Sequence, residues 1–198
     1  MKKFICVFLV IFLCANYVSA QKGTHEIYAH YGMASDNAIL DGLSKILGTV
    51  FTLGYYQPQN IHYSGDFGLT YRYNLSNRFS LGATAMYEQS TYNSYFNNEF
   101  KGNGTTSFIS VAAEGNLKYV KGTNVCLYGY LGFGATVIGY HFKPSTENNE
   151  TIERKIPFFM FNMQITPLGI SVGKNIGGFA ELGVGYKGIL TLGAYCRF

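Results

Sequence analysis

The last seven residues, Leu192-Gly193-Ala194-Tyr195-Cys196-Arg197-Phe198, show the pattern that decides the fold class. Large apolar side chains alternate with polar or small ones, and the last residue is aromatic. One face of this stretch would carry Leu192, Ala194, Cys196 and Phe198, and the other Thr191, Gly193, Tyr195 and Arg197. Because successive side chains of a strand point to opposite faces, the pattern predicts a β-strand with one apolar and one polar side.

The same alternation recurs through most of the chain. Seven earlier segments carry it, at residues 24–32, 61–73, 78–88, 106–120, 125–140, 157–172 and 178–186. Within 157–172 the phase changes at Pro167, which predicts a β-bulge, since proline cannot donate to a strand ladder. The sequence therefore predicts eight strands.

The connections between these segments alternate in length. Short, turn-like connections occupy 74–77, 121–124 and 173–177, and long polar ones occupy 34–60, 92–105 and 142–156. Lys187-Gly188 departs from the trend by being short. Short periplasmic turns and long external loops are typical of outer-membrane barrels. We therefore expect an all-β fold, an eight-stranded antiparallel up-and-down transmembrane β-barrel.

The N-terminus has the features of a secretory signal peptide. Lys2 and Lys3 precede the apolar run 4–13, and small residues at 18–20 suit cleavage. The apolar run is too short to cross a membrane comfortably as a helix, and no later apolar stretch is long enough. We expect residues 1–20 to be cleaved and residues 21–198 to form one barrel domain.

The charge and cysteine content argue against several classes of function. Loss of Lys2 and Lys3 with the signal lowers the formal net charge from +4 to +2, too small a bias for nucleic-acid binding. Cys126 is expected to face inward and Cys196 outward on strands far apart, so no disulfide framework is predicted. No Cys/His spacing suggests a metal, and no cofactor is expected.

The composition of the two faces indicates which one meets water. The polar face consists mainly of Gly, Ser, Thr, Tyr and Asn, whereas a soluble lipocalin-like barrel needs an outer face rich in Lys and Glu. We therefore expect the apolar face to contact outer-membrane lipid and the polar face to line a narrow lumen. Aromatic girdles are predicted at Tyr31, Tyr73, Tyr87, Tyr119 and Tyr186.

A glycine- and aromatic-rich pattern lies near the C-terminus. Residues 178–188 read Gly-Phe-Ala-Glu-Leu-Gly-x-Gly-Tyr-x-Gly, and the chain ends in Phe198. With these features the chain resembles small bacterial outer-membrane barrel proteins of the OmpA/OmpX type. The resemblance implies a single barrel domain without a periplasmic domain, and it implies that Phe198 is part of the signal read by the barrel-assembly machinery.

Nine charged residues are predicted to point into the lumen. They are Glu26, Asp66, Arg72, Arg78, Glu88, Glu114, Lys118, Glu181 and Arg197. Because side chains fill the interior of an eight-stranded barrel, these charges are expected to pair and to plug the lumen. Glu181 and Arg197 are the first pair expected, across the turn at Lys187-Gly188. The alternative is a narrow channel for ions or small solutes, lined by the same charges.

A catalytic alternative involves His62, Ser64 and Glu88. A regular hairpin through the turn at 74–77 would place Glu88 roughly opposite Ser64, near the outer rim. The pair His62 and Ser64 is similar to the His-x-Ser pair of outer-membrane lipid A deacylases, although Gly65 stands where that family has Asn. A lipid hydrolase is therefore a remote alternative, and no catalytic residue is expected.

The first long connection contains a candidate helix at residues 36–47. Asp36 can cap it, and Asp41 and Lys45 are one helical turn apart. An apolar stripe at helical spacing consists of Ile39, Leu40, Leu43, Ile46 and Leu47. Such a helix could cover the barrel mouth, lie on the membrane surface or pack on the rim. Residues 49–56 are compatible with an extended second strand or with a separate hairpin.

The sequence thus favours a structural or surface-interaction function in the outer membrane. The aromatic loop 92–105 is its most contact-prone segment. Tyr92, Tyr95, Phe96 and Phe100 form a candidate contact patch, unless they are girdle residues on strands that extend beyond the membrane. The expected partners are outer-membrane lipid, the assembly machinery and an external ligand or protein, with no nucleic acid. A monomer is expected.

Overall fold

The computed structural model describes residues 23–145 and 158–198. The expected signal peptide and most of the connection 142–156 therefore lie outside the described residues. The described elements are β1 (His25–Met33), α2 (Asp36–Phe51), β2 (Tyr56–Tyr63), β3 (Asp66–Asn74), β4 (Phe79–Phe96), β5 (Glu99–Lys121), β6 (Val125–Pro144), β7 (Phe158–Gly173), β8 (Ile176–Gly185) and β9 (Leu190–Arg197).

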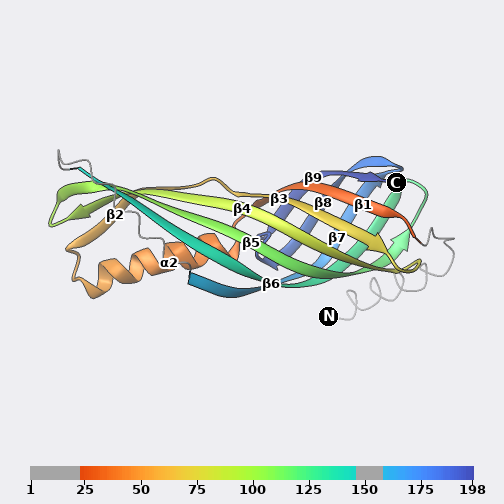
Figure 1. Cartoon of the computed structure of the whole chain (residues 1–198), viewed down its shortest axis with the longest axis horizontal. Coiled ribbons are helices and arrows are strands. Elements are labelled where there is room, and N and C mark those ends of the chain that lie inside the picture. Colours follow the sequence, from red (N-terminus) through yellow and green to blue (C-terminus); the bar gives the residue numbers. More distant parts are fainter. Residues whose placement is uncertain (1–22, 146–157) are drawn as a thin grey trace, which may run out of the picture.

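Eight of these strands close into a ring (Figure 1). Their antiparallel order is β4-β3-β1-β9-β8-β7-β6-β5, and β5 pairs with β4 to complete the ring. This confirms the predicted eight-stranded barrel. The start of β1 and the C-terminus meet at one end, where the His25 amide donates to the Phe198 carbonyl at 2.8 Å. β2 lies outside the ring and pairs with the far half of β4.

The strand register places the apolar face outward. In β1, Ile27 lies opposite Tyr71 of β3 and Cys196 of β9, and all three residues are exposed. The next residue, Tyr28, lies opposite Thr70 and is buried with it in the barrel interior. The predicted direction of the two faces is therefore confirmed.

β7 contains the predicted bulge at Pro167. The register of β7 against β8 shifts between Ile165 and Leu168. Both of these residues are exposed although they are three positions apart, so the outward phase changes between them. Proline is accommodated within the shift because a bulged residue stands outside the regular ladder of hydrogen bonds.

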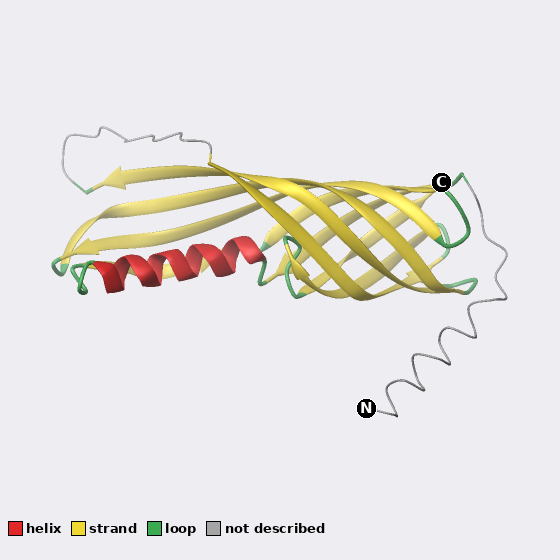
Figure 2. Ribbon diagram, turned by 90° about the horizontal axis from the view of Figure 1, so that it is seen from below, coloured by secondary structure: helices red, strands yellow, loops and turns green. Residues whose placement is uncertain are grey.

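Three strands run far beyond the barrel and form an extension (Figure 2). β4, β5 and β6 have 18, 23 and 20 residues, whereas β1, β3, β8 and β9 have eight to ten. The prediction of a loop at 92–105 is therefore wrong, because strand pairing continues to Phe96 opposite Glu99. Asn97 and Asn98 close the hairpin with positive φ angles, which asparagine tolerates better than most residues.

α2 confirms the predicted helix and extends it to Phe51. Its N-cap is Ser35 rather than Asp36, because the Ala38 amide donates to the Ser35 hydroxyl at 3.1 Å. Residues 49–51 form the last helical turn and residues 52–55 connect it to β2, so both expectations for 49–56, an extended second strand and a separate hairpin, are wrong. The helix runs beside the strands of the extension (Figure 2).

The predicted strand 61–73 is two strands in the structure. β2 ends at Tyr63, β3 begins at Asp66, and Gly65 between them has a φ of +74°, which glycine adopts without steric cost. Periodicity misses this break because Tyr63 and Phe67 are both exposed, so the alternation continues across the turn.

Candidate functional site

Polar side chains from several strands meet inside the barrel and form two charge clusters. The first surrounds Glu26, near the end of the barrel that holds the C-terminus. The buried Glu26 carboxylate accepts hydrogen bonds from Arg197 Nε at 2.7 Å, Tyr28 at 2.8 Å, Asn74 at 3.0 Å and Lys118 Nζ at 3.3 Å. Cations from β5 and β9 therefore compensate one buried carboxylate of β1.

The second cluster surrounds Arg72 of β3. The Arg72 guanidinium donates to Glu114 of β5 at 3.3 Å and to Glu181 of β8 at 3.2 Å. Tyr128 and Tyr130 of β6 donate their hydroxyls to the same Glu181 carboxylate at 2.8 and 3.0 Å. Arg72 thus joins carboxylates that come from two different parts of the ring.

Lys187 belongs to the second cluster, although it is not among the predicted lumen charges. Lys187 Nζ lies 2.5 Å from Glu114 Oε1 and 3.1 Å from Thr70 Oγ1. The side chain comes from the short turn after β8, which was expected to be external, yet it is only 1% exposed. Its spacing in the sequence could have predicted the inward direction, because Lys187 and Glu181 are six residues apart and so fall on the same face of a strand.

Tyr186 also points inward, so its assignment to an aromatic girdle is wrong. It is fully buried, and its hydroxyl donates to Glu114 at 3.3 Å. Gly185 has a φ of +137°, which interrupts the alternation and lets two successive side chains enter the barrel. Gly132 leaves room for the ring, because a Cβ atom there would collide with the Tyr186 hydroxyl. The other predicted girdle residues are at least partly exposed: Tyr31, Tyr73, Tyr87 and Tyr119.

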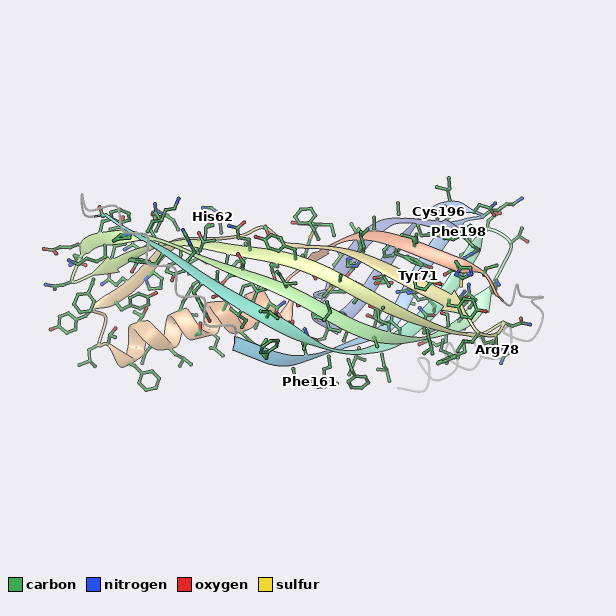
Figure 3. The ribbon with its side chains drawn as sticks, viewed as in Figure 1. His62, Tyr71, Arg78, Phe161, Cys196 and Phe198 are labelled. Carbon is green, nitrogen blue, oxygen red and sulfur yellow. The ribbon has the colours of Figure 1, made fainter. Side chains whose placement is uncertain are left out.

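Six of the nine predicted lumen charges lie in the two clusters: Glu26, Arg72, Glu114, Lys118, Glu181 and Arg197. Asp66 and Glu88 are buried elsewhere, and Glu88 accepts a hydrogen bond from Ser35 at the start of α2. Arg78 is exposed in the turn before β4 (Figure 3), so its predicted inward direction is wrong. The expected pair of Glu181 with Arg197 is also wrong, because the register sets Glu181 opposite Thr191.

The proposed hydrolase residues are not brought together. His62 (Figure 3) and Ser64 are exposed, whereas Glu88 is buried. Ser64 Oγ instead accepts a hydrogen bond from the Gln89 amide at 2.9 Å and donates to the Gly65 carbonyl at 2.8 Å. The Ser64 hydroxyl therefore bonds to backbone groups of β4 and of the turn at Gly65.

The four residues of the candidate contact patch divide between two places. The Tyr92 ring faces α2, with its centroid 4.2 Å from Lys45 Nζ, and burial raises the pKa of its phenol. Tyr95 and Phe100 pack at a centroid distance of 5.5 Å near the tip of the β4–β5 hairpin, where Phe96 ends β4. The geometry therefore supports the second interpretation, in which these residues lie on strands that extend past the barrel.

The described residues contain two cysteines and no group of side chains that could hold a metal ion. Within residues 23–145 and 158–198, no three or more His, Cys, Asp or Glu are grouped so that they could hold a metal ion. Cys126 is buried and Cys196 exposed, as predicted, and both are free thiols. In the same ranges, no helix is long and apolar enough to cross a membrane.

No family model and no curated protein matches the chain. Among solved structures, Ail, the attachment invasion locus protein of Yersinia pestis in complex with the heparin analogue sucrose octasulfate, matches at 17% identity with a TM-score of 0.49, covering 90% of this chain and 100% of that one. The N-terminal β-barrel domain of Pseudomonas aeruginosa OprF matches at 16% identity with a TM-score of 0.42, covering 89% and 98%. A second Ail structure matches at 18% identity with a TM-score of 0.41, covering 90% and 100%. All three matches have low sequence identity and extend over nearly the whole of both chains.

Proposed function

We propose that this chain is a bacterial outer-membrane β-barrel with a structural and surface-interaction role, whose lumen is closed by its own side chains. The observation that supports this proposal is that the barrel carries apolar side chains on its outside and charged ones inside, the reverse of a water-soluble protein. Leu69, Val111, Phe133 and Phe161 (Figure 3) on the outer wall are 52–72% exposed, whereas Arg72 inside is 1% exposed. An apolar exterior around a charged interior is stable where the surroundings are less polar than water.

The barrel wall has the height of the apolar band of a membrane. Strands of eight to ten residues, at about 3.3 Å per residue and a tilt of about 40°, give a height of roughly 20–25 Å. The outward apolar band of outer-membrane barrels is about 25 Å tall. The C-terminus and the extension lie at opposite ends of this wall (Figure 1), so the extension would project to the cell exterior.

The interior contacts favour a closed lumen over a channel. Glu114 pairs with both Arg72 and Lys187, so side chains of β3, β5 and the turn after β8 meet inside the ring. The contacts around Glu26 add a second layer toward the C-terminus. Because an eight-stranded barrel is only wide enough for its side chains, two layers of paired charges leave little room for a conducting path.

Wild-type mature protein in a planar bilayer is expected to be electrically silent. The double variant Glu114→Ala/Lys187→Ala removes an anion and a cation together, so it shortens two interior side chains without changing the net charge. We expect this variant to conduct, and single-channel recording checks both proteins. The matched control Glu99→Ala/Lys101→Ala removes an exposed ion pair and should remain silent.

Steady openings of the wild-type barrel would contradict the closed lumen and favour the narrow channel. Silence of the double variant, once protease protection has verified its insertion, would place the closure at the Glu26 layer instead.

The tip of the extension supports the surface-interaction role. Tyr55, Phe96 and Phe100 are 41–54% exposed there, and the Tyr55 and Phe96 rings lie 6.2 Å apart. Exposed aromatic side chains that cluster on a structured surface are typical of binding patches. The tip is therefore the region where we expect an external ligand or protein to bind.

Cells that display the wild-type protein are expected to partition into hexadecane more than cells that display Phe96→Ser/Phe100→Ser. The variant removes two exposed apolar rings, and a two-phase partition assay at equal surface amounts measures the difference. The control Asn93→Ser/Asn103→Ser changes polar residues of the same hairpin and should partition as the wild type does. Equal partition of all three would contradict an apolar tip.

A further inference from the structure

We propose that the outer side of α2 is a self-association surface and that a second copy of this chain occupies it, through parallel packing of two α2 helices. This surface, the α2 apolar face, consists of large side chains that are 44–83% exposed: Ile39, Leu40, Leu43, Ile46, Leu47, Val50 and Phe51. A monomer is the expectation from the sequence, and the exposure of these side chains changes that expectation.

The polar side of α2 is already used within the molecule. Asn37 donates to Ser110 at 3.4 Å, and Lys45 donates to Ser90 at 2.7 Å and to Asp41 at 2.5 Å. Ser90 and Ser110 are buried on the inner side of β4 and β5. The helix therefore turns its polar side toward the barrel interior and its apolar side outward, the reverse of a helix that covers a soluble core.

The spacing of the apolar residues is that of a coiled-coil seam. Ile39, Leu43, Ile46 and Val50 are separated by four, three and four residues. This is the a/d spacing of a heptad repeat, in which each side chain inserts between four side chains of a partner helix. A helix with this exposed seam is therefore suited to pack against another helix.

The bilayer does not account for the α2 apolar face. The barrel wall already has membrane height, and the 16 residues of α2 add about 24 Å beyond it (Figures 1 and 2). At the level of Lys45 and its partner Ser90, the outer side of the extension carries Gln89, Thr91 and Thr105, which are polar and at least partly exposed. The polar outer side of the extension therefore meets water at this height. Because α2 lies at the same height, its apolar face must be covered by something other than lipid.

The part of the chain between β6 and β7 has the wrong chemistry for this cover. Residues 146–157 include five charged side chains and only two apolar ones larger than proline. Burial of charges against an apolar face without partners is costly. The cover is therefore expected to come from another molecule.

A second copy fits in orientation and in area. Two copies in one membrane point the same way, so a twofold axis along the membrane normal would set their α2 helices side by side and parallel, with the seam facing itself. A stable interface takes about 800 Å² from each partner, and seven large apolar side chains, each about half exposed, supply an area of that order. The inference rests on the proposed function, because the membrane makes the two helices parallel.

Disulfide cross-linking of the whole barrel in phospholipid vesicles tests this proposal. When residues 21–198 carry Cys196→Ser, the remaining Cys126 is buried, so Leu43→Cys supplies one reactive thiol at the centre of the α2 apolar face. The control Thr91→Cys supplies an exposed thiol near the same level on the polar outer side. Under mild oxidation, Leu43→Cys is expected to yield roughly tenfold more product of twice the monomer mass than Thr91→Cys.

A charge variant provides an independent measurement. Leu43 and Leu47 are exposed, so Leu43→Glu/Leu47→Glu should retain the folded barrel, which its heat-dependent gel mobility verifies. Four carboxylates around one twofold axis are expected to reduce the mass in detergent, measured by sedimentation, from two copies to one. Thr91→Glu is the control and should keep the two-copy mass.

Three results would overturn the self-association. The first is equal cross-linking of the two cysteine variants, and the second is a mass of one copy for the folded wild type. The third is a Leu43→Cys thiol that does not react with a water-soluble maleimide even when the barrel has the mass of one copy. The last result would assign the face to the bilayer or to residues 146–157. Failure of the folded chain to insert into vesicles would instead contradict the proposed function, and sedimentation in detergent would still decide the self-association.

Discussion

Replacement of Arg72 by alanine is expected to lower the free energy of unfolding by about 3–5 kcal/mol. The substitution removes the cation that bonds to both Glu114 and Glu181. Lys187 still pairs with Glu114, whereas the hydrogen bonds that remain to the buried Glu181 among the described residues come from tyrosine hydroxyls. A buried carboxylate without its bonded cation is the physical cause of the expected loss.

Urea unfolding in lipid vesicles, followed by the gel mobility of folded and unfolded protein, measures this loss. The chain has no tryptophan, so the usual fluorescence signal is absent. The control Lys101→Ala breaks an exposed pair with Glu99 and should leave the unfolding free energy almost unchanged. The variant Arg72→Met/Glu181→Leu removes both charges and should lose less stability than Arg72→Ala. If Arg72→Ala lowered the free energy of unfolding by less than this double variant does, the role of Arg72 as the cation that compensates Glu181 would be contradicted.

Replacement of Lys45 by alanine is expected to release α2 from the extension while the barrel stays folded. The Lys45 ammonium bonds to Asp41 and Ser90 and lies over the Tyr92 ring. Without it the buried Asp41 loses its cation, which costs about 3 kcal/mol. Because the weakened contacts are those between α2 and the extension, we expect the helix to open locally while the barrel stays closed.

Hydrogen exchange of the α2 amides measures this opening, and we expect exchange about a hundredfold faster in Lys45→Ala. The control Ser44→Ala changes the neighbouring side chain, whose hydroxyl bonds within the helix to the Asp41 carbonyl, and should exchange as the wild type does. An equal increase in β1 and α2 would contradict the prediction, because it would mean that helix and barrel open as one unit.

The barrel could be predicted from the sequence because strand alternation is a local property. Leu192 is exposed and Tyr195 is buried, as the alternation of the last strand requires. The phase change at Pro167 marked the bulge, because one extra residue exchanges the two faces of a strand. The same argument predicted the strand from residue 78 only up to residue 88, whereas β4 continues to Phe96, since the polar residues of the extension show no contrast between its two sides.

The interior contacts could be predicted only in part. Alternation correctly directed Arg72 and Glu181 inward, yet it paired Glu181 with the wrong cation. Contacts across the interior depend on the relative stagger of strands that are far apart in the sequence, and alternation along one strand contains no information about that stagger. Lys187 keeps the inward phase of Glu181, whereas Tyr186 enters the barrel because the backbone at Gly185 interrupts the period.

The sequence by itself determined the strands, their inward and outward faces, and the presence of a helix with separate polar and apolar sides. Only the tertiary structure decided which environment each side of α2 meets and which charges pair inside the ring. The physical reason is that periodicity separates the faces of one element, whereas the surroundings of a face depend on its neighbours in space. For α2 these neighbours are the polar inner sides of β4 and β5, so its apolar face is left exposed.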